Sequence, residues 1–175
     1  MSALETIREK LPDAARDIRL NLQNVMDSQN LTPDQRWGVA LACAYATRNP
    51  ELRDAVVADA KAADVSDAVF EDAKAAAVLM GMNNIYYRFR HFMGPESSYD
   101  SMRANLRMQR LVNVSTNKTD FELFSLAVSS INGCETCVRS HEAVVVKGDV
   151  SDQAVHDAIR IASTLQAAAI ALELS

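Results

Sequence analysis

The sequence predicts an all-α fold, and three features lead to that conclusion. Alanine-rich stretches such as AKAAAVLMGM and LQAAAIALEL dominate a chain of 175 residues in which glycine and proline are scarce. Alanine has the highest helix propensity of all residues. Helix-capping signals recur along the chain, whereas the alternating patterns that mark strands are nearly absent. A chain of this length can also bury a real core.

The capping and periodicity signals locate the helices in order. DAARDIRLNLQNVM, residues 13–26, carries one apolar helical stripe, made of Ile18, Leu22 and Val25. LTPDQRWGVALACAYA begins with Thr32 as N-cap and Pro33 as the first helical residue, and Gln35 closes a capping box. FMGPESSYD, residues 92–100, is expected to be a loop. Further helices are expected to start after Asn49, at Ser66, near Ser101, at Thr119, around Gly133 and at Ser151.

The chain also aligns with itself at an offset of 85 residues. VSDAVFEDAKAAAVLMGMNNI from Val65 and VSDQAVHDAIRIASTLQAAAI from Val150 match without gaps. We interpret residues 1–175 as a single, internally duplicated helical domain, with repeat halves at about 31–90 and 116–175. Each of the two cysteines in the second half has a non-cysteine counterpart in the first half, so the thiols are additions to a unit that folds without them.

Charge and hydropathy exclude several classes of function. The net charge is −5 and the isoelectric point is near 5.2, which argues against a surface for nucleic acid or anionic membrane. No apolar run reaches the length of a membrane span, and the charged N-terminus lacks the apolar stretch of a signal peptide. We therefore expect a cytoplasmic protein, in which paired thiols indicate catalysis or metal binding rather than a permanent disulfide.

The stretch INGCETCVRSHE holds two of the three cysteines, Cys134 and Cys137, and one of the three histidines, His141. Haem attachment needs a histidine directly after the second cysteine, where this chain has a valine. A thioredoxin-type site needs surrounding strands, which are not predicted. A zinc site needs four ligands, and the motif supplies three, with Glu122 as a conceivable fourth.

The spacing of the motif suits thiol chemistry. Residues three and four apart stack on one face of a helix, so Cys134, Cys137 and His141 are expected to form a line. Asn132 and Gly133 favour a helix start, which would put Cys134 in the first turn, where the helix dipole favours thiolate over thiol. His141 can accept or return a proton one turn past Cys137. The motif therefore predicts a dithiol redox site.

Several other reactive residues have simpler explanations. Cys43 lies among core-like alanines and is expected to be a small apolar core residue. His156 and His91 are expected on the solvated surface. In the stretch TDFE, Thr119 would be the N-cap and Glu122 would complete a capping box, so the residues alone favour capping over catalysis for that glutamate.

The text TDFELFSLAVSSINGCETCVRSHE resembles the alkyl hydroperoxidase D family, within the larger carboxymuconolactone decarboxylase-like group. The likeness extends through RWGVALACAYATRNPEL and AAAVLMGMNNIYYRFR and so covers most of the chain. The resemblance implies an all-α, internally duplicated fold and a homotrimer.

The resemblance also implies an antioxidant function. It implies reduction of alkyl hydroperoxides and re-reduction of a partner peroxiredoxin, alkyl hydroperoxide reductase C. The electrons would come from a dihydrolipoyl group on a 2-oxo acid dehydrogenase component, with no bound cofactor or metal. Cys137 matches the thiol that passes through sulfenic acid and Cys134 its disulfide-forming partner, while Glu122 and His141 match members of the proton relay.

One position departs from the family pattern. Characterised members can carry a histidine between the cysteines, where this chain has Thr136. A hydroxyl cannot act as a base near neutral pH, so the relay is expected to be shortened or water-mediated and peroxidase activity to be weaker. The helix dipole also favours Cys134 as the more acidic thiol, whereas the resemblance assigns the attack to Cys137.

Two other functions remain as alternatives. One is decarboxylation of a lactone, as in the wider group, although that reaction has no need of paired thiols. The other is a zinc-binding or redox-sensing helical module without peroxidase turnover.

Overall fold

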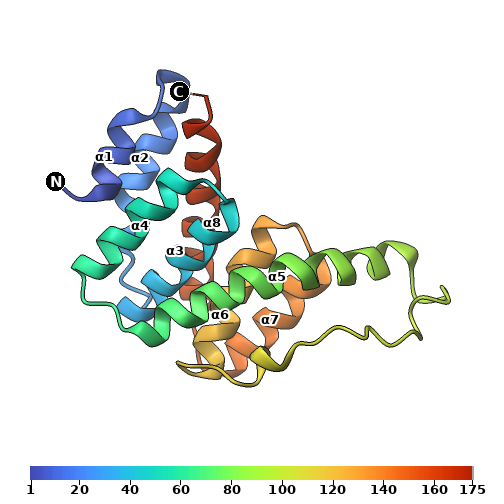
Figure 1. Cartoon of the computed structure of the whole chain (residues 1–175). Coiled ribbons are helices and arrows are strands. Elements are labelled where there is room, and N and C mark those ends of the chain that lie inside the picture. The colour runs from blue at the N-terminus through green and yellow to red at the C-terminus, as the bar shows by residue number, and fades with distance from the viewer. Residues whose placement is uncertain (175) are drawn as a thin grey trace.

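The computed structural model describes residues 1–174, and Figure 1 shows an arrangement built from helices. Eight α-helices and three short 3-10 helices account for the regular structure of these residues, and no strand occurs among them. The all-α prediction is confirmed. The α-helices are α1 (Ala3–Lys10), α2 (Arg16–Asn24), α3 (Pro33–Thr47), α4 (Pro50–Ala62), α5 (Asp67–Met93), α6 (Lys118–Ile131), α7 (Glu135–Lys147) and α8 (Asp152–Leu172).

Local capping signals predicted most of the helix starts. Thr32 and Gln35 form the expected capping box at the start of α3, and the side chains of Asn49 and Ser151 cap α4 and α8. Helix α5 begins directly after Ser66, as expected. The helix predicted over residues 13–26 is present as α2, with a 3-10 turn on either side.

One predicted helix is absent, and one helix was not predicted. No helix starts near Ser101; residues 103–108 are irregular, and Asn105 has a left-handed backbone with φ of 51°. Hydrogen bonds to α5 hold the chain on either side of this segment, from Arg90 to Asp100 before it and from Arg110 to Asp72 after it. Helix α1 was not anticipated, although Ser2 and Glu5 form a capping box that the sequence contains.

Helices α3 and α6 form the centre of the molecule. Helix α3 packs against α5, α6 and α8, and α6 packs in addition against α7. The largest fully buried side chains include Phe121 and Phe124 from α6 and Leu41 from α3. A Cβ atom at Gly38 of α3 would lie 2.0 Å from the ring of Phe124. Glycine is therefore required where the two helices approach most closely.

The helix starts follow the 85-residue offset of the predicted repeat. Helices α3 and α6 begin at Pro33 and Lys118, α4 and α7 at Pro50 and Glu135, and α5 and α8 at Asp67 and Asp152. Gln35 and Asp120, which occupy equivalent positions under this offset, are hydrogen-bonded to each other at 2.8 Å. These coincidences support an internal duplication, and the boundaries of its two halves stay a prediction.

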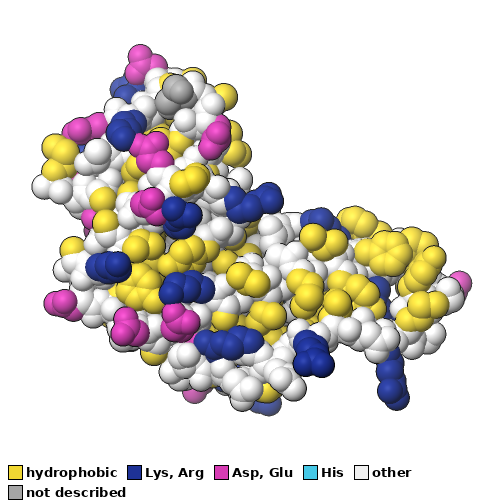
Figure 2. Space-filling view, in the orientation of Figure 1, with side chains coloured by type: hydrophobic (Ala, Val, Ile, Leu, Met, Phe, Trp, Pro, Cys, Tyr) yellow, Lys and Arg dark blue, Asp and Glu magenta, His cyan; other side chains and the backbone are white. Residues whose placement is uncertain are grey.

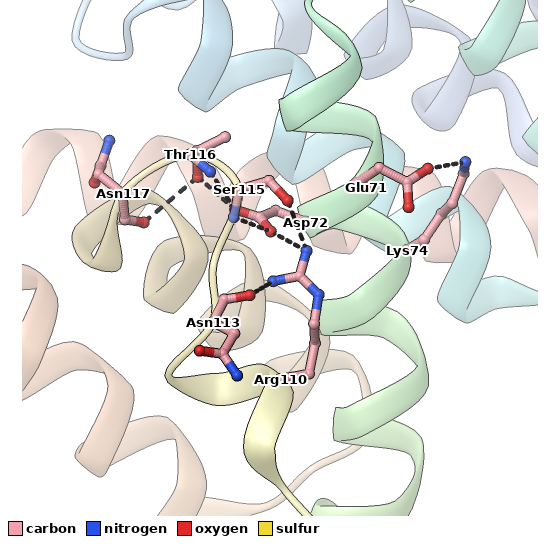
Figure 3. A network of polar contacts seen from close by, with 8 residues as sticks. All are labelled: Glu71, Asp72, Lys74, Arg110, Asn113, Ser115, Thr116 and Asn117. Atoms are coloured by element: carbon pink, nitrogen blue, oxygen red, sulfur yellow. Dashed lines mark hydrogen bonds and ion pairs between the residues drawn. The ribbon is translucent and has the colours of Figure 1, made fainter.

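Equivalent aspartates hold the segment that precedes each half. Asp72 of α5 accepts hydrogen bonds from the backbone N–H groups of Ser115 and Thr116, just before α6, and pairs with Arg110 at 2.5 Å (Figure 3). Burial raises the pKa of Asp72, but these hydrogen bonds and that of the Thr116 hydroxyl outweigh it and leave the pKa below its usual range.

Asp157 binds the segment before α3 in the same manner. Its Oδ2 atom accepts hydrogen bonds from Ser28 at 2.7 Å and from Asn30 at 2.9 Å. These bonds, together with the nearby Arg160, lower the pKa of Asp157 to about 2. Each long helix therefore uses one ionised carboxylate to fix the chain that leads into the other half.

The C-terminal part of α5 projects beyond the other helices, and the chain returns alongside it (Figure 1). Hydrophobic side chains gather on this projecting arm (Figure 2). Over residues 1–174, none of the helices has the length and apolar character needed to cross a membrane. The large exposed hydrophobic residues of the arm and its return are Ile85, Phe89, Phe92, Met93, Tyr99 and Met102.

Candidate active site

The two cysteines of the motif lie at the junction of α6 and α7. Gly133 has a left-handed backbone, φ of 65°, that turns the chain between the two helices. Cys134 is the N-cap residue of α7, one position before the predicted first turn, and Cys137 lies in that turn. The sulfurs form a disulfide bond, with the Cα atoms 5.3 Å apart. The motif therefore has the geometry to cycle between dithiol and disulfide.

The two sulfurs differ in how they can be reached. Cys134 is completely buried, with 0% of its surface exposed, whereas Cys137 is 8% exposed. Cys137 lines a pocket of about 490 Å³, and Cys134 does not. A molecule in this pocket therefore meets Cys137 first. The other lining residues are Met80, Asn83, Tyr87, Met108, Leu111, Lys118, Glu122, Thr136, Ser140, His141 and Val144.

A row of polar side chains forms one wall of the pocket. His141 Nδ1 lies 2.5 Å from Glu122 Oε2, and His141 Nε2 lies 3.2 Å from the sulfur of Met80. Lys118 Nζ lies 2.5 Å from the second carboxylate oxygen of Glu122. These contacts join α5, α6 and α7, which come from both halves of the predicted repeat.

Glu122 is ionised in this arrangement. Burial raises its pKa, but hydrogen bonds from His141 and Lys118 outweigh that effect and hold the pKa of Glu122 below its usual range. An ionised carboxylate only accepts hydrogen bonds, so the Nδ1 atom of His141 is the donor to it. Nε2, which lies against the Met80 sulfur, is then the ring nitrogen without a carboxylate partner.

The predicted capping role of Glu122 is wrong. Helix α6 begins at Lys118, so Thr119 lies inside the helix and the N-cap is Asn117. The side chain of Asn117 accepts a hydrogen bond from the backbone N–H of Asp120 and donates one to the Asp120 carboxylate. Because Asn117 and Asp120 make the capping contacts between them, Glu122 does not cap the helix and instead binds His141.

The structure brings the four sequence-predicted site residues into two pairs. Cys134 is bonded to Cys137, and Glu122 is bonded to His141. The pocket joins the pairs, because Cys137, Glu122 and His141 all line it. Among residues 1–174, no group of three or more histidine, cysteine, aspartate or glutamate side chains has a metal-binding arrangement. Both motif sulfurs are engaged in the disulfide.

Sequence reasoning missed three side chains of the pocket. Lys118 lies four residues before Glu122 on α6, a spacing that could have predicted the ion pair. Met80 contacts His141 across 61 positions of sequence, and no local pattern indicates that contact. Asn83 is buried, and its Oδ1 atom has no hydrogen-bond partner among the described residues. An amide in that condition is available to a polar group of a bound molecule.

The remaining reactive residues behave as the sequence predicts. Cys43 is fully buried in the core, and burial raises the pKa of its thiol far above the usual value. A neutral, enclosed thiol of this kind is inert. The side chain of His156 is 76% exposed on α8. Neither residue lines the pocket.

Comparison with known proteins identifies the family. The pattern that describes the carboxymuconolactone decarboxylase family matches residues 99–174. A protein of Anaeromyxobacter dehalogenans (strain 2CP-C) named alkyl hydroperoxide reductase AhpD is 61% identical over the whole chain, which covers 93% of that relative. The chain belongs to the AhpD family. The resemblance noted in the sequence is thereby confirmed.

More distant members of the AhpD family match over the same extent. A protein of the same name from Anaeromyxobacter sp. (strain Fw109-5) is 57% identical over 99% of this chain and 92% of the relative. One from Brucella canis is 47% identical over 98% of this chain and 97% of the relative. The likeness to the AhpD family therefore covers both predicted halves and the segment that joins them.

Proposed function

We propose that the protein is an alkyl hydroperoxide reductase that works through the Cys134–Cys137 pair. The observation that carries the proposal is a disulfide between two cysteines of which one, Cys137, opens into a pocket next to an ionised Glu122 and its bonded His141. The names of the relatives support peroxide reduction as the reaction. A permanent structural disulfide would need neither the pocket nor the paired histidine.

The proposed oxidative half-reaction begins at Cys137. Its thiolate attacks the terminal peroxide oxygen, the O–O bond breaks, and the alcohol leaves with a proton while Cys137 becomes a sulfenic acid. The Cys134 sulfur then displaces water to form the disulfide. His141 is the proton carrier in both steps, because it lies one turn from Cys137 and Glu122 fixes its ring. Cys137, Cys134, His141 and Glu122 are thus the proposed catalytic set.

A reductant must reopen the Cys134–Cys137 disulfide to complete the catalytic cycle. We propose that a dihydrolipoyl group of a 2-oxo acid dehydrogenase component reduces the disulfide, and that the reduced protein can in turn re-reduce a peroxiredoxin, alkyl hydroperoxide reductase C. A slender dithiol arm suits a pocket in which Cys137 is the cysteine among the lining residues. No cofactor needs to be bound, because the electrons arrive on the partner. The cytoplasm, where such partners and a reducing thiol pool occur, is the proposed location.

We further propose a homotrimer, the state that the family resemblance implies. The arm of α5 supports this proposal, since exposed side chains such as Phe92 (74%) and Met93 (47%) are clustered rather than scattered. Contiguous exposed apolar surface of this kind usually marks an interface. Sedimentation equilibrium of the purified chain would test it, with a mass three times that of the chain expected.

The test of the function is steady-state turnover with cumene hydroperoxide as oxidant and dihydrolipoamide as reductant. The wild-type chain is expected to consume both, and Cys134→Ser and Cys137→Ser to consume neither. Cys43→Ala, which changes the buried thiol outside the pocket, is the matched control and should turn over. Unchanged activity in either motif variant would contradict the proposal.

A further inference from the structure

The unequal burial of the two sulfurs determines which thiol leaves when the disulfide is reduced. An incoming thiolate can reach only Cys137, because Cys134 is fully enclosed. Attack on the Cys137 sulfur breaks the S–S bond and expels Cys134 as a thiolate. The N-terminus of α7 stabilises that charge, since Cys134 is its N-cap residue. A buried thiolate must still gain a proton before the disulfide stays open.

Thr136 is the polar group in contact with the buried sulfur. Its hydroxyl oxygen lies 3.7 Å from Cys134 Sγ. A disulfide sulfur carries no hydrogen, so the Thr136 hydroxyl is the donor in this contact. Thr136 lines the pocket that contains Cys137, and it also lines a second cavity of about 360 Å³ on the arm side of the motif.

The second cavity contains a histidine. His91 from the arm of α5 lines it together with Thr136. The Nε2 atom of His91 lies 3.5 Å from Glu135 Oε2, the residue between Cys134 and Thr136. The ring is 43% exposed, so it can exchange protons with bulk water. Two imidazoles therefore lie near the motif, His141 in the pocket that contains Cys137 and His91 in the cavity that contains Thr136.

We propose that His91 supplies the proton for the leaving Cys134 thiolate through the Thr136 hydroxyl, a second route separate from the Glu122–His141 pair. The inference rests on the proposed dithiol function. The hydroxyl gives its proton to Cys134 Sγ and takes one from the protonated imidazole, directly or across a water in the cavity. The imidazole is then reprotonated from solvent. His91 acts through Thr136 and does not touch the reacting sulfur.

The second thiol of the same dithiol completes the reduction, so no further reactant is needed. The first thiolate of a dithiol such as dihydrolipoamide is now joined to Cys137 as a mixed disulfide. Its second thiol gives its proton to His141 and attacks the sulfur joined to Cys137, which closes the dithiol into a cyclic disulfide. Cys137 leaves with the electron pair and recovers the proton from His141. Two electrons have passed from the dithiol to the two cysteines.

The charged groups around His91 affect this route. Glu135 lies 3.5 Å from the Nε2 atom of His91 and is also paired with Arg139 at 3.0 Å. Arg90 and Asp100 line the cavity as an ion pair with each other, so they largely offset one another. Tyr87 is the remaining titratable group in the lining. An imidazole donates a proton only when it is protonated, so the route should fade as the solution becomes alkaline.

The experiment is single-turnover reduction of the oxidised full-length chain by excess dihydrolipoamide, followed by acid quench and thiol alkylation. We expect His91→Gln to slow reduction about tenfold at pH 6, which is below the usual range of about 10²- to 10⁴-fold for a general acid–base group because water can partly substitute. The ratio of wild-type to variant rates should approach one by about pH 9. Thr136→Val should slow reduction likewise, and Thr136→Ser, which restores a hydroxyl, should recover most of the rate lost in Thr136→Val. His156→Gln, an exposed histidine on α8, is the matched control.

A double variant separates a relay from a general effect on the fold. If His91 acts through Thr136, adding His91→Gln to Thr136→Val should slow reduction no further. The proposed route would be overturned if the rate reductions of the two single variants multiplied in the double variant. It would also be overturned if His91→Gln were reduced at the wild-type rate at pH 6. Either result would leave the dithiol function intact. A wild-type disulfide that dihydrolipoamide leaves unreduced would overturn both.

Discussion

His141 is the side chain on which the proposed chemistry depends most. Its Nδ1 atom is bonded to a carboxylate that is held ionised by its two partners, His141 and Lys118. This bond fixes the ring and leaves Nε2, which contacts the Met80 sulfur, as the nitrogen that is not bonded to the carboxylate. A carboxylate–histidine pair of this geometry orients a general acid–base group in the same way as in other acid–base sites.

We therefore expect His141→Gln to slow oxidation of the dithiol by cumene hydroperoxide by about 10²- to 10⁴-fold. Glutamine can still donate a hydrogen bond to Glu122, so the pocket should keep its shape, but it cannot carry a proton near neutral pH. Stopped-flow fluorescence or quenched thiol counting would measure the rate. His156→Gln again serves as control, and a His141→Gln rate within a factor of two of wild type from pH 6 to 8 would exclude His141 from the mechanism.

The segment between α5 and α6 is held in place by hydrogen bonds to one buried carboxylate, that of Asp72, and not by the hydrogen bonds of a regular helix. Residues 103–108 lack regular structure, yet the chain before α6 is held by hydrogen bonds from Ser115, Thr116 and Arg110 to Asp72 (Figure 3). Met108 and Leu111 of the same segment line the pocket. The Asp72 contacts therefore support the wall that faces Cys137.

Asp72→Asn should lower the free energy of unfolding by about 1–3 kcal/mol at pH 7, because buried donors lose a charged acceptor. The pKa of Asp72 is below its ordinary value in the folded protein. Its stabilisation is therefore fully present above about pH 4 and is lost as the pH falls through the folded pKa. Urea denaturation at pH 7 and pH 3 should show the difference between wild type and variant shrinking in acid.

The neighbouring Glu71 provides the control for this prediction. It pairs with Lys74 at 2.7 Å on the surface of α5 (Figure 3), and an exposed pair of this kind contributes about 0–1 kcal/mol. Glu71→Gln should therefore change stability little at either pH. An Asp72→Asn variant as stable as Glu71→Gln at pH 7 would mean that Asp72 does not hold the segment.

For the whole molecule, the features that the sequence predicts are those that local signals encode. Thr32, Asn49 and Ser151 mark helix starts through contacts to the next turn, so these starts could be predicted to the residue. The repeat offset likewise predicts where later helices begin, because it compares one helical unit with another. The all-α fold and the position of the cysteines at a helix start follow from such signals.

The features that the sequence does not predict depend on contacts between distant residues. Met80 reaches His141 from another helix, and His91 reaches Glu135 from the arm of α5. Glu122 was given a capping role because TDFE fits the local pattern, whereas the structure uses the preceding Asn117 and leaves Glu122 to a residue 19 positions away. Periodicity and spacing do not report which helices meet, so these pairings emerge only in three dimensions.

The most direct test of the central claim is a count of free thiols under denaturing conditions before and after one equivalent of cumene hydroperoxide. The chain has three cysteines, of which Cys43 is enclosed in the core. The account predicts that three thiols per fully reduced chain fall to one, with Cys134 and Cys137 recovered as a disulfide by peptide mass mapping. Three thiols remaining after exposure to peroxide, or a loss confined to Cys43, would contradict it.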